Sequence, residues 1–196
     1  MRRTMLRSFL VAGIMVCGVG WTASADQGTY QTSPIFQAGN PAMLRNGAVT
    51  LYRYKQRLEV RVATSGLNTN SAYTVWWVVF NNPAACVGGC GPDDLGNPAV
   101  DAAVFYAAGF VTGNDGTGNV SAYVNSGVLP AGVDRVLEAT GDRLEPGNGY
   151  GAEVHIVVRG HGAINPGHVH EQIGSFNGGC NPTCSNQQAA IFPPVQ

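Results

Sequence analysis

The sequence predicts an all-β protein, an antiparallel β-sandwich of about seven strands with long loops rich in Gly, Pro and Asn. Short segments alternate between apolar and polar residues with a period of two, which is typical of half-buried strands. Turn-forming residues separate these segments, and the chain contains 27 glycines. Charged residues make up only 12% of the chain, whereas disordered proteins combine high charge with low hydrophobicity.

Residues 1–25 are predicted to be a cleaved signal peptide of bacterial type. Three arginines precede an apolar run at residues 9–19, and Ala23-Ser24-Ala25 is a cleavage pattern that would leave Asp26 as the new N-terminus. An uncleaved membrane anchor is less favoured because the run is shorter than about 20 residues. A lipoprotein modified at Cys17 is also less favoured, because the bulky Val16 precedes it. The expected location is therefore secreted or periplasmic.

The rest of the chain is expected to form one domain. Residues 26–46 are predicted to be an extended leader with one edge strand near Ile35, and residues 47–196 a single β-sandwich domain. The signal segment holds three Arg and no acidic residue, so its removal lowers the net charge from −1 to −4. A mildly acidic chain of this kind has no basic patch for nucleic acid or anionic lipid. No transmembrane segment is expected in the mature chain, and a cell-surface or protein partner is compatible with it.

The first predicted strands form a hairpin. Residues 48–54 are β-branched and aromatic, Lys55-Gln56 is a weak turn signal, and residues 57–63 alternate. Residues 73–80 are apolar on both faces, which predicts a central strand covered on both sides. Residues 104–111 follow, with Gly109 as a possible bulge. The turn at residues 113–116 predicts a hairpin with the strand at residues 119–124.

The C-terminal half is less regular. A short helix is predicted over residues 134–144, although Gly141 interrupts it. Residues 152–158 predict a strand with Val154, Ile156 and Val158 pointing inward. Residues 189–192 predict a last edge strand, ended by two prolines. Six or seven short strands with turn signals between them favour a sandwich of immunoglobulin-like type.

Several motifs resemble a group of secreted bacterial β-sandwich proteins. They are Leu58-Glu59-Val60-Arg61-Val62, Ser65-Gly66-Leu67, Tyr73-Thr74-Val75-Trp76-Trp77, Phe80-Asn81-Asn82-Pro83, Asp93-Asp94-Leu95 and Gly178-Gly179-Cys180, together with Cys86 and Cys90. That group implies no particular activity. Over about two strands the chain is also similar to the CHRD domain and to the extracytoplasmic domain of anti-sigma-K factors, which supports only the fold class.

Four cysteines in the mature chain form two C-x-x-x-C units, Cys86 with Cys90 and Cys180 with Cys184. An exported protein with an even number of cysteines is normally oxidised. Two local disulfides are favoured, because glycine-rich loops can bring the Cα atoms within bonding range. Pairing between the two units and a four-thiolate zinc site remain alternatives, although zinc ribbons usually space their cysteines as C-x₂-C.

All four histidines fall within residues 155–170. Imidazole nitrogens bind copper and zinc, and two histidines one residue apart on an extended segment point the same way. His161, His168 and His170 are therefore candidate ligands for Cu or Zn, with Glu171 or His155 as a fourth. The competing interpretation is that His155 lies on the polar face of a strand and the others are solvated loop residues.

No catalytic motif is present: the chain lacks a nucleophile elbow, a HExxH helix and a phosphate-binding loop. The leading functional hypothesis is a secreted or periplasmic non-catalytic module, binding or structural, with no cofactor. The first alternative is a copper or zinc protein that uses the histidines. The second is a hydrolase whose carboxylates, such as Glu153 or Glu171 with Asp94, converge only in the fold. Trp76 and Trp77 are expected in the core rather than in a sugar-binding platform.

Overall fold

Eight antiparallel strands in one hydrogen-bonded sheet dominate the computed structural model, which describes residues 26–131 and 139–195. The strands are β1 (Thr29–Gln37), β2 (Asn40–Tyr54), β3 (Arg57–Thr64), β4 (Ser71–Phe80), β5 (Ala102–Val111), β6 (Gly118–Asn125), β7 (Glu153–Ala163) and β8 (Ser185–Phe192). The other regular elements of these residues are α1 (Val169–Gly174) and two short 3-10 helices, η1 (Pro83–Ala85) and η2 (Pro92–Asp94). The prediction of an all-β protein is confirmed.

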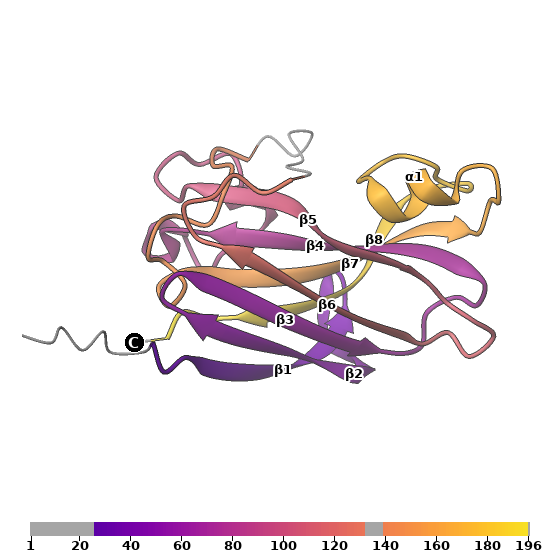
Figure 1. The fold of residues 1–196 in the computed structure, drawn as a ribbon, viewed down its shortest axis with the longest axis horizontal. Coiled ribbons are helices and arrows are strands. Elements are labelled where there is room, and N and C mark those ends of the chain that lie inside the picture. The colour runs from indigo at the N-terminus through magenta and orange to yellow at the C-terminus, as the bar shows by residue number, and fades with distance from the viewer. Residues whose placement is uncertain (1–25, 132–138, 196) are drawn as a thin grey trace, which may run out of the picture.

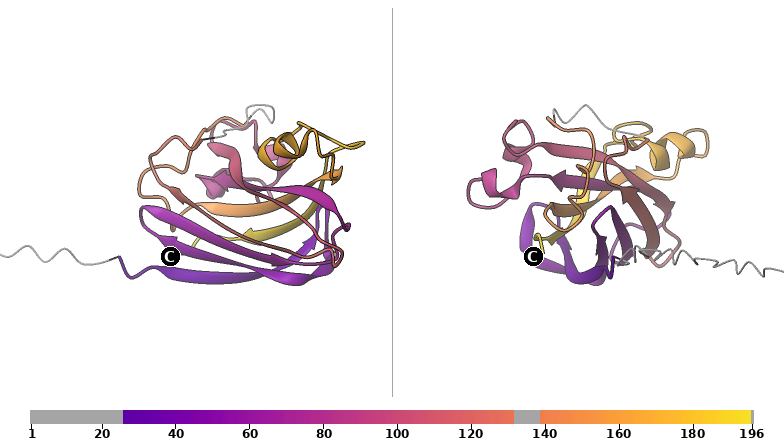
Figure 2. Two further views of the ribbon diagram at one scale, coloured as in Figure 1. Left: turned by 45° about the vertical axis from the view of Figure 1, so that its right-hand side comes forward. Right: turned by 60° about the vertical axis from the view of Figure 1, so that its left-hand side comes forward.

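The sheet curls into a nearly closed barrel. Its strand order is β5-β4-β7-β8-β1-β2-β3-β6, and the two edge strands, β5 and β6, come into contact (Figures 1 and 2). The predicted seven-strand immunoglobulin-like sandwich is therefore corrected to one eight-stranded sheet. Alternation along a strand shows which face is buried, but sandwiches and barrels share that alternation. Closure depends on sheet twist and on pairing between distant strands.

Apolar side chains from all eight strands fill the barrel interior. The largest are aromatic: Trp77 from β4, Phe105 from β5 and Phe192 from β8, none more than 1% exposed. The inward residues of β7 (Val154, Ile156 and Val158) are fully buried, as their alternation predicts. This interior fixes the orientation of the opposite, outward-facing side chains.

The outward face of β4 is buried as well, which confirms that this strand is covered on both sides. Trp76 packs against Val104 and Phe176. Phe80 packs against Val100 and Ala102 beneath the loop that follows β4. Helix α1 lies against β4 and β5 on this same outer side of the sheet (Figure 1). The outer face of β4 is therefore a second, smaller packing layer.

The first and last segments of the described chain form more strand than predicted. Residues 26–46, predicted as an extended leader, hold β1 and the first part of β2. β1 pairs with β2 from Thr29 to Gln37 and with β8 at Phe36 and Gln37. β1 and β8 are predicted at edges, yet both lie in the middle of the sheet. Their pairing joins segments that are far apart in the sequence, and local sequence patterns cannot predict such a pairing.

β5 and β6 follow each other through the predicted turn at residues 113–116, but they do not form a backbone ladder. The ring of Phe110 stacks on Tyr73, with centroids 5.3 Å apart. A Cβ placed on Gly118 would lie 2.3 Å from the Phe110 ring. This aromatic side chain therefore lies against the start of β6. The predicted hairpin is wrong, although its turn residues do connect the two strands.

Other expectations fall partly or wholly outside the described residues. Residues 139–144 of the predicted helix are not helical, and residues 134–138 lie outside the described part, as does the predicted signal peptide. The predicted bulge is real but misplaced: the extra residue of β5 is Ala107, whereas Gly109 pairs with Thr74. Within the described ranges, no helix has the length and apolar character needed to cross a membrane.

Candidate functional site

Two disulfide-bonded loops flank the outer face of the sheet. Cys86 is bonded to Cys90 and Cys180 to Cys184, each pair with a Cα–Cα distance of 5.1 Å. This local pairing agrees with the favoured prediction, and it replaces the alternatives of cross-pairing and a four-thiolate site. The first disulfide packs against the Phe80 cluster, and the second lies in the segment between α1 and β8.

An apolar pocket of about 160 Å³ opens on this outer face, between the two loops. Its apolar walls include Trp76, Phe80, Val104, Val157 and Phe176, and its polar lining residues are His155 and Asn186. Gly91 and Pro92 also line it and follow Cys90 directly, while Phe176 precedes Cys180 by four residues. Each disulfide therefore restrains the chain close to one wall of the pocket.

The aromatic wall is held by ring contacts. Trp76 meets Phe176 edge to face, with ring centroids 4.9 Å apart, and Tyr106 in the same manner at 5.8 Å. The guanidinium of Arg159 lies 4.1 Å from the centroid of the Phe176 ring and donates a hydrogen bond to the Phe176 carbonyl. These contacts fix the Phe176 ring. The wall is thus formed before any ligand arrives.

His155 supplies the polar edge of the pocket. Its Nε2 lies 2.8 Å from Oε1 of Glu153, and both side chains are more than four-fifths buried. Burial lowers the pKa of His155 below its usual 6.5, while the hydrogen bond that His155 donates to Glu153 partly opposes the shift. The imidazole is therefore neutral at pH 7. Because Nε2–H is donated to the carboxylate, Nδ1 is left as an acceptor.

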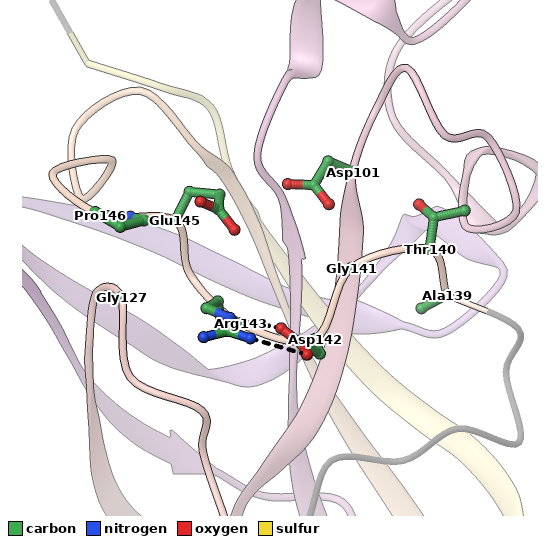
Figure 3. Close-up of a pocket in the computed structure, with 9 residues that line it drawn as sticks. All are labelled: Asp101, Gly127, Ala139, Thr140, Gly141, Asp142, Arg143, Glu145 and Pro146. Carbon is green, nitrogen blue, oxygen red and sulfur yellow. Dashed lines mark hydrogen bonds and ion pairs between the residues drawn. The ribbon is translucent and has the colours of Figure 1, made fainter.

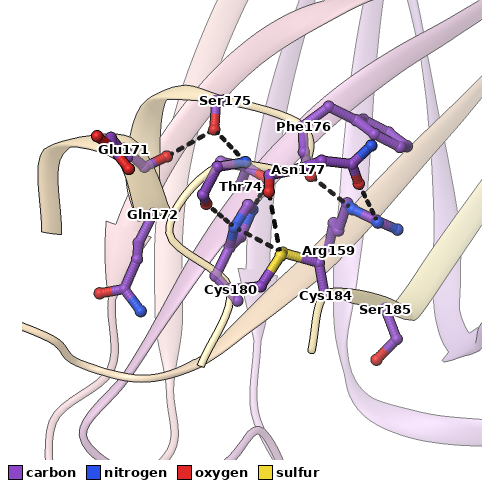
Figure 4. The surroundings of a disulfide bond; sticks show 12 residues. Thr74, Arg159, Glu171, Gln172, Ser175, Phe176, Asn177, Cys180, Cys184 and Ser185 are labelled. Carbon is purple, nitrogen blue, oxygen red and sulfur yellow. Dashed lines mark hydrogen bonds between the residues drawn. A yellow bond between two sulfur atoms is a disulfide. The ribbon is translucent and has the colours of Figure 1, made fainter. Parts of the chain in front are cut away.

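His161 lies at the far end of β7 and is fully buried, in contrast to the solvated loop position considered from the sequence. Its Nε2 is 2.9 Å from the Thr74 hydroxyl, which also accepts a hydrogen bond from Trp76 Nε1. Its Nδ1 is 3.0 Å from the Gly178 carbonyl and 3.1 Å from Cys184 Sγ. Figure 4 shows Thr74, Cys180 and Cys184 around this network.

The predicted histidine cluster is dispersed over two environments. His168 precedes α1 and lies 3.4 Å from a carboxylate oxygen of Glu171, and His170 is on α1; both are exposed. The one group of three close ligand atoms among the described residues joins His161 to Cys180 and Cys184 instead, all within 4.8 Å. The structure thus places one of the three predicted histidines beside potential ligands that the sequence treats separately.

Carboxylates gather elsewhere, around a polar cavity of about 340 Å³ (Figure 3). Asp101, Asp142 and Glu145 line it, and Arg143 forms a two-point ion pair with Asp142, with N–O distances of 2.6 and 3.0 Å. The acids named for the hydrolase hypothesis do not line this cavity. Glu153 accepts a hydrogen bond from His155, Glu171 is on α1, and Asp94 accepts a hydrogen bond from the Gly91 amide. Arg143 offsets part of the negative charge in this cavity.

We expect the free energy of unfolding to fall as the pH drops below about 6.5, partly because His161 is buried as the neutral form. Burial, the largest cause, lowers the pKa of His161, and the nearby Arg159 adds to the shift, while the hydrogen bond to Gly178 opposes it. The unfolded chain then binds more protons than the native chain, so this contribution is present above the unfolded pKa and is lost on acidification.

Urea unfolding at about pH 7.5 and about pH 5 measures this effect. His161→Gln should show a smaller loss between the two pH values, because glutamine does not titrate. His155 and its lowered pKa remain in the variant and contribute in the same direction. An equal loss in the wild type and His161→Gln would contradict the assignment to His161.

Known proteins add no functional assignment, since no family model and no curated protein sequence matches the chain.

Proposed function

We propose that the protein is an exported, non-catalytic binding module whose outer-face pocket holds a ring-sized apolar group of its ligand. The observation that carries the proposal is the pocket itself, with aromatic walls and few polar groups at its edge. Preformed apolar pockets with a small number of polar groups are the usual form of a small-molecule site.

The size of the pocket limits what it can hold. A cavity of about 150 Å³ lined by apolar side chains accommodates benzene, and this pocket measures about 160 Å³. The match supports a single aromatic or branched aliphatic group as the part of the ligand that enters. The Nδ1 acceptor of His155 favours a ligand that also carries a hydroxyl or amine donor.

The chemistry of the lining supports binding rather than catalysis. The pocket is lined by no Ser, Thr, Cys or Lys side chain that could act as a nucleophile. Its histidine is hydrogen-bonded to Glu153, as a triad histidine is to its carboxylate, but no hydroxyl or thiol lines the pocket for the other ring nitrogen to activate. Export is supported by the signal-like residues 1–25 and by the two disulfides, which persist in oxidising compartments.

Phenol is a suitable probe because it combines one ring with one hydroxyl donor. We expect calorimetry to show one saturable site with a dissociation constant of about 0.1–1 mM, since so small a ligand can contribute only a few kcal/mol. Val157→Phe, which fills the pocket from β7, should weaken binding at least about 10-fold, a loss of about 1.4 kcal/mol.

The matched control is Val111→Phe, the same change at the exposed end of β5, outside the pocket. It should leave the affinity for phenol unchanged within about 2-fold. Equal binding by both variants, or no saturable binding to the wild type, would overturn the proposed site.

A further inference from the structure

The second disulfide, unlike the first, has an imidazole beside it. Nδ1 of His161 is 3.1 Å from Cys184 Sγ, and the three potential ligand atoms of His161, Cys180 and Cys184 lie within 4.8 Å of one another. Among the described residues, no histidine or carboxylate joins Cys86 and Cys90 in a comparable group. The two C-x-x-x-C units share a Cα–Cα distance of 5.1 Å, so they differ in the side chains around the disulfide and not in the spacing of their cysteines.

The surroundings of His161 resemble the support that a metal ligand receives. A ligating imidazole usually donates its other ring N–H to an oxygen, which fixes the ring and its tautomer. The Thr74 hydroxyl oxygen is 2.9 Å from His161 Nε2 and can accept that hydrogen. Trp76 Nε1 donates to the same oxygen at 2.8 Å, so the hydroxyl is held in place. With the disulfide intact, Nδ1 also lies 3.0 Å from the Gly178 carbonyl, which accepts its hydrogen. Binding of a metal ion at Nδ1 would replace that hydrogen bond, with the ring hydrogen carried by Nε2 toward Thr74 and the Nδ1 lone pair facing the two sulfur atoms.

We propose that reduction of the Cys180–Cys184 disulfide converts this cluster into a Cu(I) site. A dithiol reductant transfers two electrons and two protons to the disulfide and is itself oxidised to a disulfide. The two thiols formed lose their protons to solvent when Cu(I) binds, and copper keeps its oxidation state. Cys180 Sγ, Cys184 Sγ and His161 Nδ1 are the three ligands.

The ligand set favours Cu(I) over other ions. Thiolates are soft ligands that select Cu(I) or zinc over harder cations. Zinc is also held by Cys₂His sets, but with water or substrate as a fourth ligand, whereas Cu(I) is stable with only the three ligands that the cluster supplies.

The test uses the mature protein, reduced with a phosphine and then titrated anaerobically with Cu(I) held by a chromogenic chelator. The chain supplies its own matched pair: Cys86→Ser/Cys90→Ser removes the disulfide without a histidine, and Cys180→Ser/Cys184→Ser removes the proposed ligands. We expect the first double variant to take one equivalent of Cu(I) from the chelator after reduction and none when oxidised. The second should take none in either state.

Thr74→Val keeps all three ligands and removes the oxygen that orients the imidazole. We expect it to bind Cu(I) about 10–100-fold more weakly, the usual effect of losing such a partner. Retained Cu(I) binding in Cys180→Ser/Cys184→Ser, or equal binding before and after reduction, would overturn the site. Displacement of Cu(I) by an equal concentration of Zn²⁺ would overturn the choice of metal.

Discussion

Replacing Arg53 with methionine should lower the free energy of unfolding by about 3–5 kcal/mol, because it leaves several buried hydrogen-bond acceptors without a donor at one end of the barrel. Arg53 lies on β2 with no exposed surface, and all five of its N–H groups are donated. The acceptors are Gln31 Oε1 and the carbonyls of Gly149, Ala152, Phe192 and Pro193, at distances of 2.6–3.1 Å.

This guanidinium joins parts of the chain that no strand ladder connects directly. It ties β2 to the loop before β7 and to the end of β8, at 96 to 140 residues of separation. Burial lowers the pKa of Arg53 to about 10, with Glu153 opposing the shift. The side chain therefore stays charged at neutral pH, and its desolvation is compensated by the five hydrogen bonds.

Urea unfolding of Arg53→Met measures the loss, with Arg45→Met as the control. Arg45 is on the same strand but exposed, with one hydrogen bond to Gln37, so its replacement should change stability by less than about 0.5 kcal/mol. Arg53→Lys should recover only part of the loss, since lysine has three donors. A loss below about 1 kcal/mol for Arg53→Met would contradict this role.

Gly109→Ala should destabilise the protein by about 1–3 kcal/mol and displace α1 from the sheet. A Cβ built on Gly109 would lie 1.9 Å from the carbonyl oxygen of Ile173, the same oxygen that accepts the Tyr106 hydroxyl. The Ile173 oxygen is a backbone atom, so the clash with the new Cβ cannot be relieved by a change of rotamer. The helix must move, and the segment that carries Phe176 follows it.

Hydrogen exchange and thermal unfolding measure the Gly109→Ala effect. Amides of α1 should exchange faster, whereas those of β2 and β3 should keep their relative protection. Gly96→Ala is the control, because a Cβ there meets nothing within 4 Å. Unchanged exchange in α1 together with an unchanged melting temperature would show that the helix does not depend on this close approach.

The sequence predicts individual strands better than it predicts their arrangement. Residues 73–80 are apolar on both faces, and β4 is indeed covered on both sides. Likewise, Val154, Ile156 and Val158 alternate and are buried. The pairing of β1 with β8 joins Phe36 to Ala189. These residues are far apart in the sequence, so no local sequence pattern indicates that they pair. Barrel closure depends on such contacts, which explains why a sandwich is the natural expectation.

The candidate sites are predictable only in part. Spacing and glycine content favour the two local cysteine pairs without excluding cross-pairing, and they do not indicate the environment of His161. β7 extends past the predicted Val158 to Ala163, and Gly162, with φ of +85°, approaches the Asn181 carbonyl where a Cβ would lie 1.7 Å away. This close approach brings the Cys180–Cys184 loop onto the end of β7. His161 is buried by that contact.

The proposed function is tested most directly by intermolecular NOEs between phenol and isotope-labelled methyl groups of the protein. Leu95, Val104 and Val157 line the pocket, whereas Val111 lies outside it. At saturating phenol, NOEs to the three lining residues and none to Val111 are the predicted result. NOEs spread over surface methyl groups, or absent from all three lining residues, would contradict a ring-binding pocket between the two disulfide loops.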